Sequence, residues 1–344
     1  MTDRTSGDDR ISANEEAAPE VRRGLRFTPM DLAPRDVTPW APVLFLLLLI
    51  LGFTIVEPQY FATGENAVTI LNDGALLAIL ACGLTFVLIV GEFDLSIAAV
   101  ASFAGALSTV LITQQGWPVL PAVLAVLASA VAIGLVNGLL VIRLEIPALV
   151  ATIGSASLLD GLTLWITGNS VIFSGFTDAF MALGNWRLGG LQAPVIYLAV
   201  LAGILALALR YTVTGRHLYA TGGNRAASRM SGIRVERQVM LAFIACALLA
   251  AIAGLVYTSR QGSLTPLFGN SLLLPAFAAA FLGSVTLVHR RFHILGSVIG
   301  VYIIGTGTFG LLLIGAPAYS QQLFAGGVLI AATGGSKLRE ILRR

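Results

Sequence analysis

Charged residues are scarce in this chain of 344 residues: Asp, Glu, Lys and Arg together make up 11% of it. A soluble domain usually has about 25% charged residues. Hydrophobic residues make up 56%, and the mean hydropathy is +0.87. The composition therefore excludes an ordinary soluble domain and indicates an integral membrane protein, in contact with membrane lipid along most of its length. The small net charge of +3 gives no indication of a nucleic-acid partner.

Residues that carry catalysis or bind metals are also few. Cys82 and Cys246 lie in apolar runs, where a buried thiol usually acts as a small hydrophobic residue. His289 and His293 are four apart, but no Glu follows the first, as a zinc-protease motif requires. The chain has neither a G-x-x-x-x-G-K-S/T phosphate loop nor a G-x-S-x-G nucleophile motif. We therefore expect no metal site, no cofactor and no catalytic residue.

Long apolar runs predict an all-α polytopic transmembrane bundle. A span needs about 20 mostly apolar residues, and these runs are continuously apolar rather than alternating, which argues against spanning strands. Ten candidate spans cover residues 39–57, 74–91, 95–114, 119–142, 146–167, 193–210, 238–258, 271–288, 293–315 and 318–335. We expect a disordered cytoplasmic tail over residues 1–38, a transmembrane domain over 39–336 and a basic cytoplasmic C-terminus over 337–344.

The basic residues are unevenly distributed along the chain. With the N-terminus inside, six lie in the tail, one is Arg143, six lie in the loop 210–237, two are Arg290 and Arg291, and four follow residue 336. That places 19 of the 21 on the cytoplasmic side and leaves only Arg187 and Arg260 outside. Because Lys and Arg near span ends stay in the cytoplasm, both termini and the loop 210–237 are predicted to be cytoplasmic.

Four polar residues lie at or near membrane depth and are candidates for a translocation path or gate: Glu92, Asp94, Asn137 and Asp160. Asp94 could instead cap the helix that follows it. Asp160 has no basic neighbour in the sequence, so it needs a partner on another helix or a wet cavity. Asn137 is expected to make an interhelical hydrogen bond.

Small residues recur at a spacing of four inside the spans. Gly296 precedes Gly300, and Ala250 precedes Gly254. This spacing lets helix backbones approach closely. Tight packing within one bundle and a seam between two copies are both consistent with it.

Three motifs in chain order carry a resemblance to ribose/xylose-type ABC importer permeases, over about residues 58–336. The stretch 220–233 resembles the coupling loop of that family, A-x-G-G-N-P-E-A-A-R-L-S-G-I. Gly91 and Asp94–Ser96 resemble G-G-I-D-L-S, and residues 134–154 resemble G-x-x-N-G-x-L-V followed by I-P and A-T-L-G. Two departures are Arg225, where the family has Pro, and Glu92, where it has Gly.

The resemblance implies a non-catalytic permease subunit of the bacterial plasma (inner) membrane. It also implies an extracytoplasmic solute-binding protein, a second permease copy and a cytoplasmic ABC ATPase that binds the ATP. The solute would be a sugar, with pentoses, hexoses, polyols and signalling sugars left open. The implied ATPase-docking residues are Gly222, Gly223, Asn224, Ala226, Ala227, Ser228, Ser231 and Gly232.

Other classes of protein remain open on the sequence alone. A related importer permease for branched-chain amino acids or nucleosides would have the same architecture. An ion-coupled secondary transporter would usually carry several intramembrane ionisable groups, and only Asp160 is clearly central in a span. A membrane enzyme is disfavoured because catalytic clusters are missing.

Overall fold

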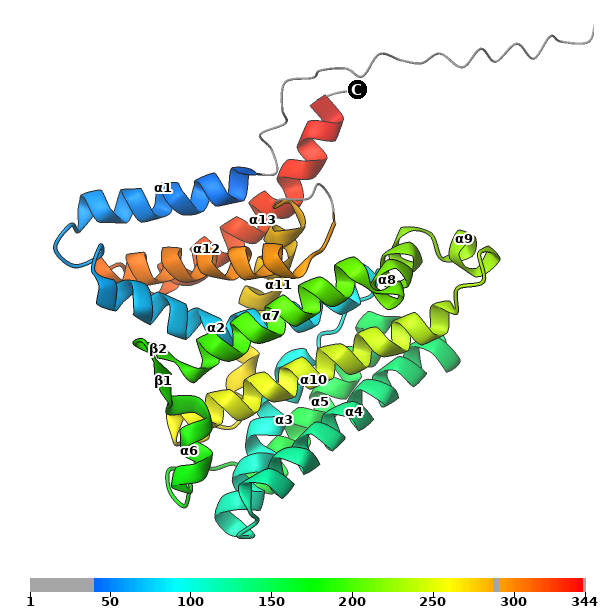
Figure 1. Ribbon diagram of the computed structural model, residues 1–344, viewed down its shortest axis with the longest axis horizontal. Helices are drawn as coiled ribbons and strands as arrows, with labels where there is room; N and C mark the ends of the chain where they lie inside the picture. The colour runs from blue at the N-terminus through cyan, green and yellow to red at the C-terminus, as the bar shows by residue number, and fades with distance from the viewer. Residues whose placement is uncertain (1–39, 287–290, 343–344) are drawn as a thin grey trace, which may run out of the picture. The chain divides into compact units, whose positions relative to one another are not determined.

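Figure 1 shows the computed structural model, which describes residues 40–286 and 291–342. The predicted cytoplasmic tail, His289, Arg290 and the last two arginines lie outside the described residues. The described residues are predominantly helical and contain only two short strands, which confirms the all-α prediction. The longer helices, in chain order, are α1 (Ala41–Val56), α2 (Gly64–Ile89), α3 (Ile97–Thr109), α4 (Val119–Arg143), α5 (Ala148–Thr167), α7 (Ala193–Tyr211), α10 (Val235–Gln261), α11 (Leu273–Ser284), α12 (Ile294–Leu313) and α13 (Ala318–Leu342).

A helix occurs at each of the ten predicted spans, but these helices differ in length and in apolar character. Within the described residues, seven helices are long and apolar enough to cross a membrane: α2, α3 with its π-helical end Val110–Gln114, α4, α5, α7, α10 and α12. Two shorter apolar helices are Ala41–Val56 and Phe268–Ser284. The prediction of ten spans is therefore approximate.

Several short elements lie between the spans. The helix α6 (Asp178–Asn185) begins after Thr177, whose side chain accepts a hydrogen bond from the backbone N–H of Phe180. Strands β1 (Arg187–Leu188) and β2 (Leu191–Gln192) form a small antiparallel hairpin. The 3-10 helix η3 (Phe268–Leu272) precedes α11. The loop predicted between the sixth and seventh spans contains α8 (Val213–Gly223) and α9 (Arg225–Met230).

The core is built around α2 and α10. Helix α10 packs against α2, α3 and α4, and α12 packs against α2 and α11. The most apolar window of α2 and of α3 is 78% buried, whereas that of α4 or α5 is only 22% buried. Helices α4 and α5 therefore lie at the periphery of a single copy. Cys82 and Cys246 are free and buried, as expected for small hydrophobic residues.

Glycines allow the central helices to touch backbone to backbone. A Cβ on Gly254 of α10 would overlap with the carbonyl oxygen of Ala101 on α3. On α12, a Cβ on Gly300 would overlap with the carbonyl oxygen of Ala279, and one on Gly296 with that of Gly283. The spacing of four thus serves packing within one bundle, which was the first of the two interpretations.

We expect Gly254→Ala to destabilise the protein, because the methyl group would push α10 away from α3. Overpacking of this kind costs about 1–3 kcal/mol. The matched control is Gly203→Ala on α7, where no atom lies within 4 Å of a new Cβ. Thermal midpoints of the detergent-solubilised protein should fall for the first variant and stay unchanged for the second. Equal midpoints for both would show that this helix contact is not tight.

Candidate functional site

The segment between α7 and α10 forms a compact helical unit at one end of α10, called here the loop end (Figure 1). Thr212 caps α8 by accepting a hydrogen bond from the N–H of Gly215 at 3.1 Å. Asn224 caps α9 by accepting one from the N–H of Ala227 at 3.0 Å. Because both helices start at a side-chain cap, the segment has a defined shape rather than that of a plain linker.

The residues implied as docking residues differ in where they point. The side chains of Ala226, Ala227 and Ser231 are exposed, and Met230 beside them is 90% exposed. Gly232 is exposed with φ +79°, a left-handed conformation that favours glycine. Ser228 is buried and faces inward. The outward surface of α9 therefore combines the small side chains of Ala226 and Ala227 with the long side chains of Met230 and Arg229, the latter 59% exposed.

Gly222 lies where α8 touches the end of α2. A Cβ at this position would overlap with the carbonyl oxygen of Ile89. Gly223, by contrast, has no neighbouring atom within 4 Å of a new Cβ. Gly222 therefore permits a backbone contact within this chain, whereas Gly223 faces open space.

Arg225 and Glu92 form an ion pair. Each of them stands at a position where the chain departs from the family motif that it otherwise resembles. Arg225 Nη2 lies 2.6 Å from Glu92 Oε1 and donates a second hydrogen bond to the carbonyl oxygen of Val90 at 3.1 Å. A second pair, Arg229 with Glu236 at 2.8 Å, joins α9 to the start of α10. Glu92 is thus held to the loop end.

The loop end also contacts the segment before α12. The hydroxyl of Tyr219 on α8 donates a hydrogen bond to the carbonyl oxygen of Phe292 at 2.9 Å. The guanidinium of Arg291 lies 5.9 Å from the centre of the Tyr219 ring. Burial raises the pKa of the Tyr219 hydroxyl, and the Arg291 charge acts in the opposite direction. Helix α8 therefore connects two turns that are far apart in the sequence.

A buried polar network lies inside the bundle next to the α2–α3 turn. Asp94, 1% exposed, accepts hydrogen bonds from the backbone N–H and the hydroxyl of Ser96. Asn137 on α4 donates to the Ser96 hydroxyl at 2.9 Å and accepts from the Ser155 hydroxyl on α5. The expected interhelical hydrogen bond of Asn137 is therefore confirmed.

Asp94 differs in detail from the expected helix cap. The residue that precedes α3 is Ser96, and Asp94 binds the N–H of Ser96 itself. Burial raises the pKa of the Asp94 carboxyl, while its hydrogen bonds with Ser96 lower it. The carboxyl group therefore has its partners inside the turn and the network rather than along the helix.

Asp160 lies apart from the other three candidates. Its Oδ2 accepts a hydrogen bond from Asn270 Nδ2 of η3 at 3.2 Å. Its Oδ1 is buried and has no hydrogen-bond partner, and the same is true of the Thr163 hydroxyl one turn further along α5. Asn270 is thus the partner on another helix that the sequence led us to expect for Asp160. One oxygen of the Asp160 carboxyl group is left without a hydrogen bond.

An open cleft of about 410 Å³ lies between α9, the α4–α5 turn and α10. Its lining combines apolar residues such as Val141 and Val239 with charged ones. The charged residues that line it are Glu92, Glu145, Arg225, Arg229 and Glu236. Water therefore reaches both ion pairs of α9.

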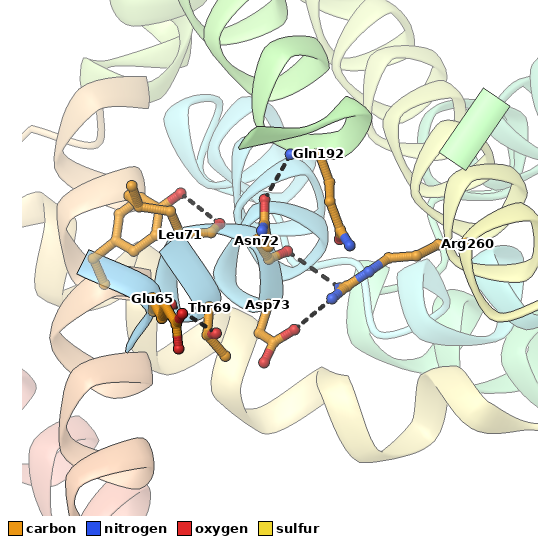
Figure 2. A network of polar contacts seen from close by, with 8 residues as sticks. Glu65, Thr69, Leu71, Asn72, Asp73, Gln192 and Arg260 are labelled. Carbon is orange, nitrogen blue, oxygen red and sulfur yellow. Dashed lines mark hydrogen bonds and ion pairs between the residues drawn. The ribbon is translucent and has the colours of Figure 1, made fainter. Parts of the chain in front are cut away.

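A second polar cluster lies at the opposite end of α10 (Figure 2). Arg260 Nη2 pairs with Asp73 Oδ1 at 2.7 Å, and its Nη1 donates to the carbonyl oxygen of Asn72 at 3.3 Å. The Asn72 side chain in turn accepts a hydrogen bond from the backbone N–H of Gln192 at 3.0 Å. Sequence reasoning missed this cluster, although Arg260 was one of the two basic residues outside the predicted cytoplasmic set.

Within the described residues, no group of three His, Cys, Asp or Glu side chains could hold a metal ion. The ends of the spans carry connecting turns, ion pairs and a capped helical loop. Together, these features describe a polytopic helical bundle with a capped, ion-paired helical segment at one end of α10.

Comparison with known proteins identifies the class more closely. Residues 66–333 match the family model described as the branched-chain amino acid transport system / permease component. The chain belongs to this family, and it is a multi-pass membrane permease component. Membership agrees with a transport function and disagrees with the membrane enzyme and the ion-coupled transporter that the sequence had left open.

Curated relatives are similar over most of their length. The ribose import permease protein RbsC of Escherichia coli strain K12 is 34% identical over 290 residues, 83% of this chain and 90% of the relative. RbsC of Bacillus subtilis is 35% identical over 292 residues, 85% and 90% of the two chains. The L-arabinose ABC transporter permease protein AraH of Azospirillum brasilense is 32% identical over 302 residues, 88% of each chain.

Proposed function

We propose that this chain is the transmembrane permease subunit of an ATP-binding-cassette importer for a sugar or a sugar-like solute, and that it hydrolyses no ATP itself. The observation that carries the proposal is α9, a capped helix between two spans that presents Ala226, Ala227 and Met230 outward. The small Ala226 and Ala227 allow a partner to approach this capped helix closely, and the exposed Met230 adds an apolar contact. The relatives named as ribose and L-arabinose permeases support the solute class.

The partners follow from this assignment. A cytoplasmic ATPase subunit would dock on α8 and α9, and a solute-binding protein would deliver solute at the opposite end. A second permease copy would cover part of the exposed face of α5, because little of this span is buried within one copy. Rigid-body movement of the docked ATPase would then move the spans that flank the loop.

The loop end is proposed to face the cytoplasm, as the distribution of basic residues indicates. Cysteine at exposed Ala226 should be inaccessible to an impermeant thiol reagent added to intact cells, whereas cysteine at exposed Arg187 should react. The native thiols Cys82 and Cys246 are buried and should give little background. Labelling of position 226 from outside would contradict this topology and place the loop end outside the cell.

The docking role is tested by Ala227→Trp. Ala227 is exposed, so the indole should clash with the ATPase and leave the bundle intact. We expect loss of ATPase co-purification and at least about a tenfold fall in solute-stimulated ATP hydrolysis, a change of about 1.4 kcal/mol. Ala62→Trp, exposed in the turn before α2, places the same bulk at the opposite end and serves as control.

A complex with normal ATPase content and normal uptake in the Ala227→Trp variant would reject the docking assignment. Gly232→Trp is a poorer probe, because φ at this residue is +79° and any side chain there strains the backbone. A defect in that variant would not separate docking from local distortion.

Asp160 is proposed to face the solute path between two permease copies. It lies on the little-buried α5, its Oδ1 lacks a partner, and Asn270 holds only the other oxygen. Asp160→Leu should lower the maximal uptake rate severalfold in a protein that still inserts and assembles. Leu158→Ala, at a 72% exposed neighbour on the same helix, should transport normally. Unchanged uptake kinetics in Asp160→Leu would remove the path role.

A permease for branched-chain amino acids is the second candidate, because the matching family model bears that description. An uptake panel with pentoses, hexoses, nucleosides and branched-chain amino acids separates the two. Saturable uptake of an amino acid alone would favour the second candidate.

A further inference from the structure

The contact between Arg225 and Glu92 joins the loop end to the turn between α2 and α3. Arg225 belongs to α9, and its Nη2 contacts both Glu92 Oε1 at 2.6 Å and the carbonyl oxygen of Val90 at 3.1 Å. Next to it, the backbone at Gly222 lies directly against Ile89, the last residue of α2. Two kinds of contact therefore link the loop end to the same short segment, residues 89–92.

These two contacts resist opposite movements. Close backbone packing at Gly222 resists a push of α8 toward α2, because atoms in van der Waals contact cannot approach further. It offers little resistance when α8 and α9 move away. The ion pair and the hydrogen bond of Arg225 resist such separation, since charge-assisted hydrogen bonds are lost when their partners move apart. Only the Arg225 contact can thus pull the α2–α3 turn along with α9.

On its other side, the same turn is bound to α5. The N–H of Leu95 donates to the Thr152 hydroxyl at 3.1 Å. Asp94 is connected through Ser96 and Asn137 to Ser155, which also lies on α5. Thr152 and Ser155 precede Asp160 on that helix. The α2–α3 turn therefore lies between α9 and α5, with polar contacts to each.

We expect the Arg225–Glu92 pair to contribute little to folding, because one of its partners is well exposed to solvent. The side chain of Arg225 is 42% exposed and that of Glu92 is 13% exposed, and both line the open cleft, so that water partly screens the pair. Removing either charge should leave the bundle folded. The pair therefore fits a role in transmitting movement better than a role in stabilising the folded protein.

We propose that Arg225 and Glu92 are positioning residues that transmit the withdrawal of α9 to the α2–α3 turn, and through it to α5. This inference rests on the proposed function, in which α9 is the element moved by the ATPase. It differs from docking, because it requires that the ATPase remains bound while its movement no longer reaches α5.

The test uses the whole transporter, with its ATPase and binding protein, reconstituted in proteoliposomes. Arg225→Met keeps the apolar stem and removes the charge, and Glu92→Ala removes the acceptor. Both variants should co-purify ATPase and melt as the unmodified protein does. Their uptake per ATP hydrolysed should fall at least about fivefold, the lower end of typical coupling effects.

A charge reversal and a matched control sharpen the result. The double variant Glu92→Arg with Arg225→Glu restores a pair of opposite charges and should recover most of the uptake per ATP. Arg229→Met removes the other ion pair of α9, which contacts Glu236 of α10 and not the α2–α3 turn. This control should couple normally.

Three outcomes would overturn the proposal. The first is a normal ratio of uptake to hydrolysis in both single variants, and the second is an equal loss in Arg229→Met. The third is loss of ATPase co-purification in Arg225→Met, which would make Arg225 a docking residue. The docking assignment itself would survive all three, because it depends on the separate result for Ala227→Trp.

Discussion

The inner part of the turn between α2 and α3, at Asp94 and Ser96, must satisfy its polar groups where almost no water reaches them, and the arrangement of the surrounding helices depends on this requirement. Asp94 is 1% exposed, and Ser96 and Asn137 are fully buried. A buried polar group without a partner costs about 1–3 kcal/mol, so each of these side chains needs a fixed neighbour. Ser96 at the start of α3, Asn137 on α4 and Ser155 on α5 supply those neighbours. The network therefore fixes how these helices lie relative to the turn.

Close helix packing makes the centre of the bundle stiff. At Gly254 and Gly300 the backbone of one helix touches the carbonyl groups of the next, which leaves no room for small sliding movements. Helices α4 and α5 are much less buried within one copy. Movement and contact with partners are accordingly easier to accommodate at this periphery than between α2, α3 and α10.

Each end of α10 carries an arginine–carboxylate contact to another element. At the loop end Arg229 pairs with Glu236, and at the opposite end Arg260 pairs with Asp73 of α2. Arg260 is an exception to the uneven distribution of basic residues, and its side chain is only 23% exposed. Pairing with Asp73 and the Asn72 carbonyl gives the guanidinium a local role that explains its place outside the predicted cytoplasmic set.

The sequence by itself determined the class of fold, the approximate place of every long helix and the family, because apolar length and motif order are local properties of the chain. It also marked Asn137 and Asp160 as residues that need partners. Only the tertiary structure decided which partners these are: Ser96 and Ser155 for Asn137, and Asn270 for Asp160. In the sequence, Arg225 and Glu92 are two unrelated departures from two different motifs, 133 residues apart. Their contact arises from the packing of α8 against the end of α2, and no local pattern encodes a contact between segments so far apart.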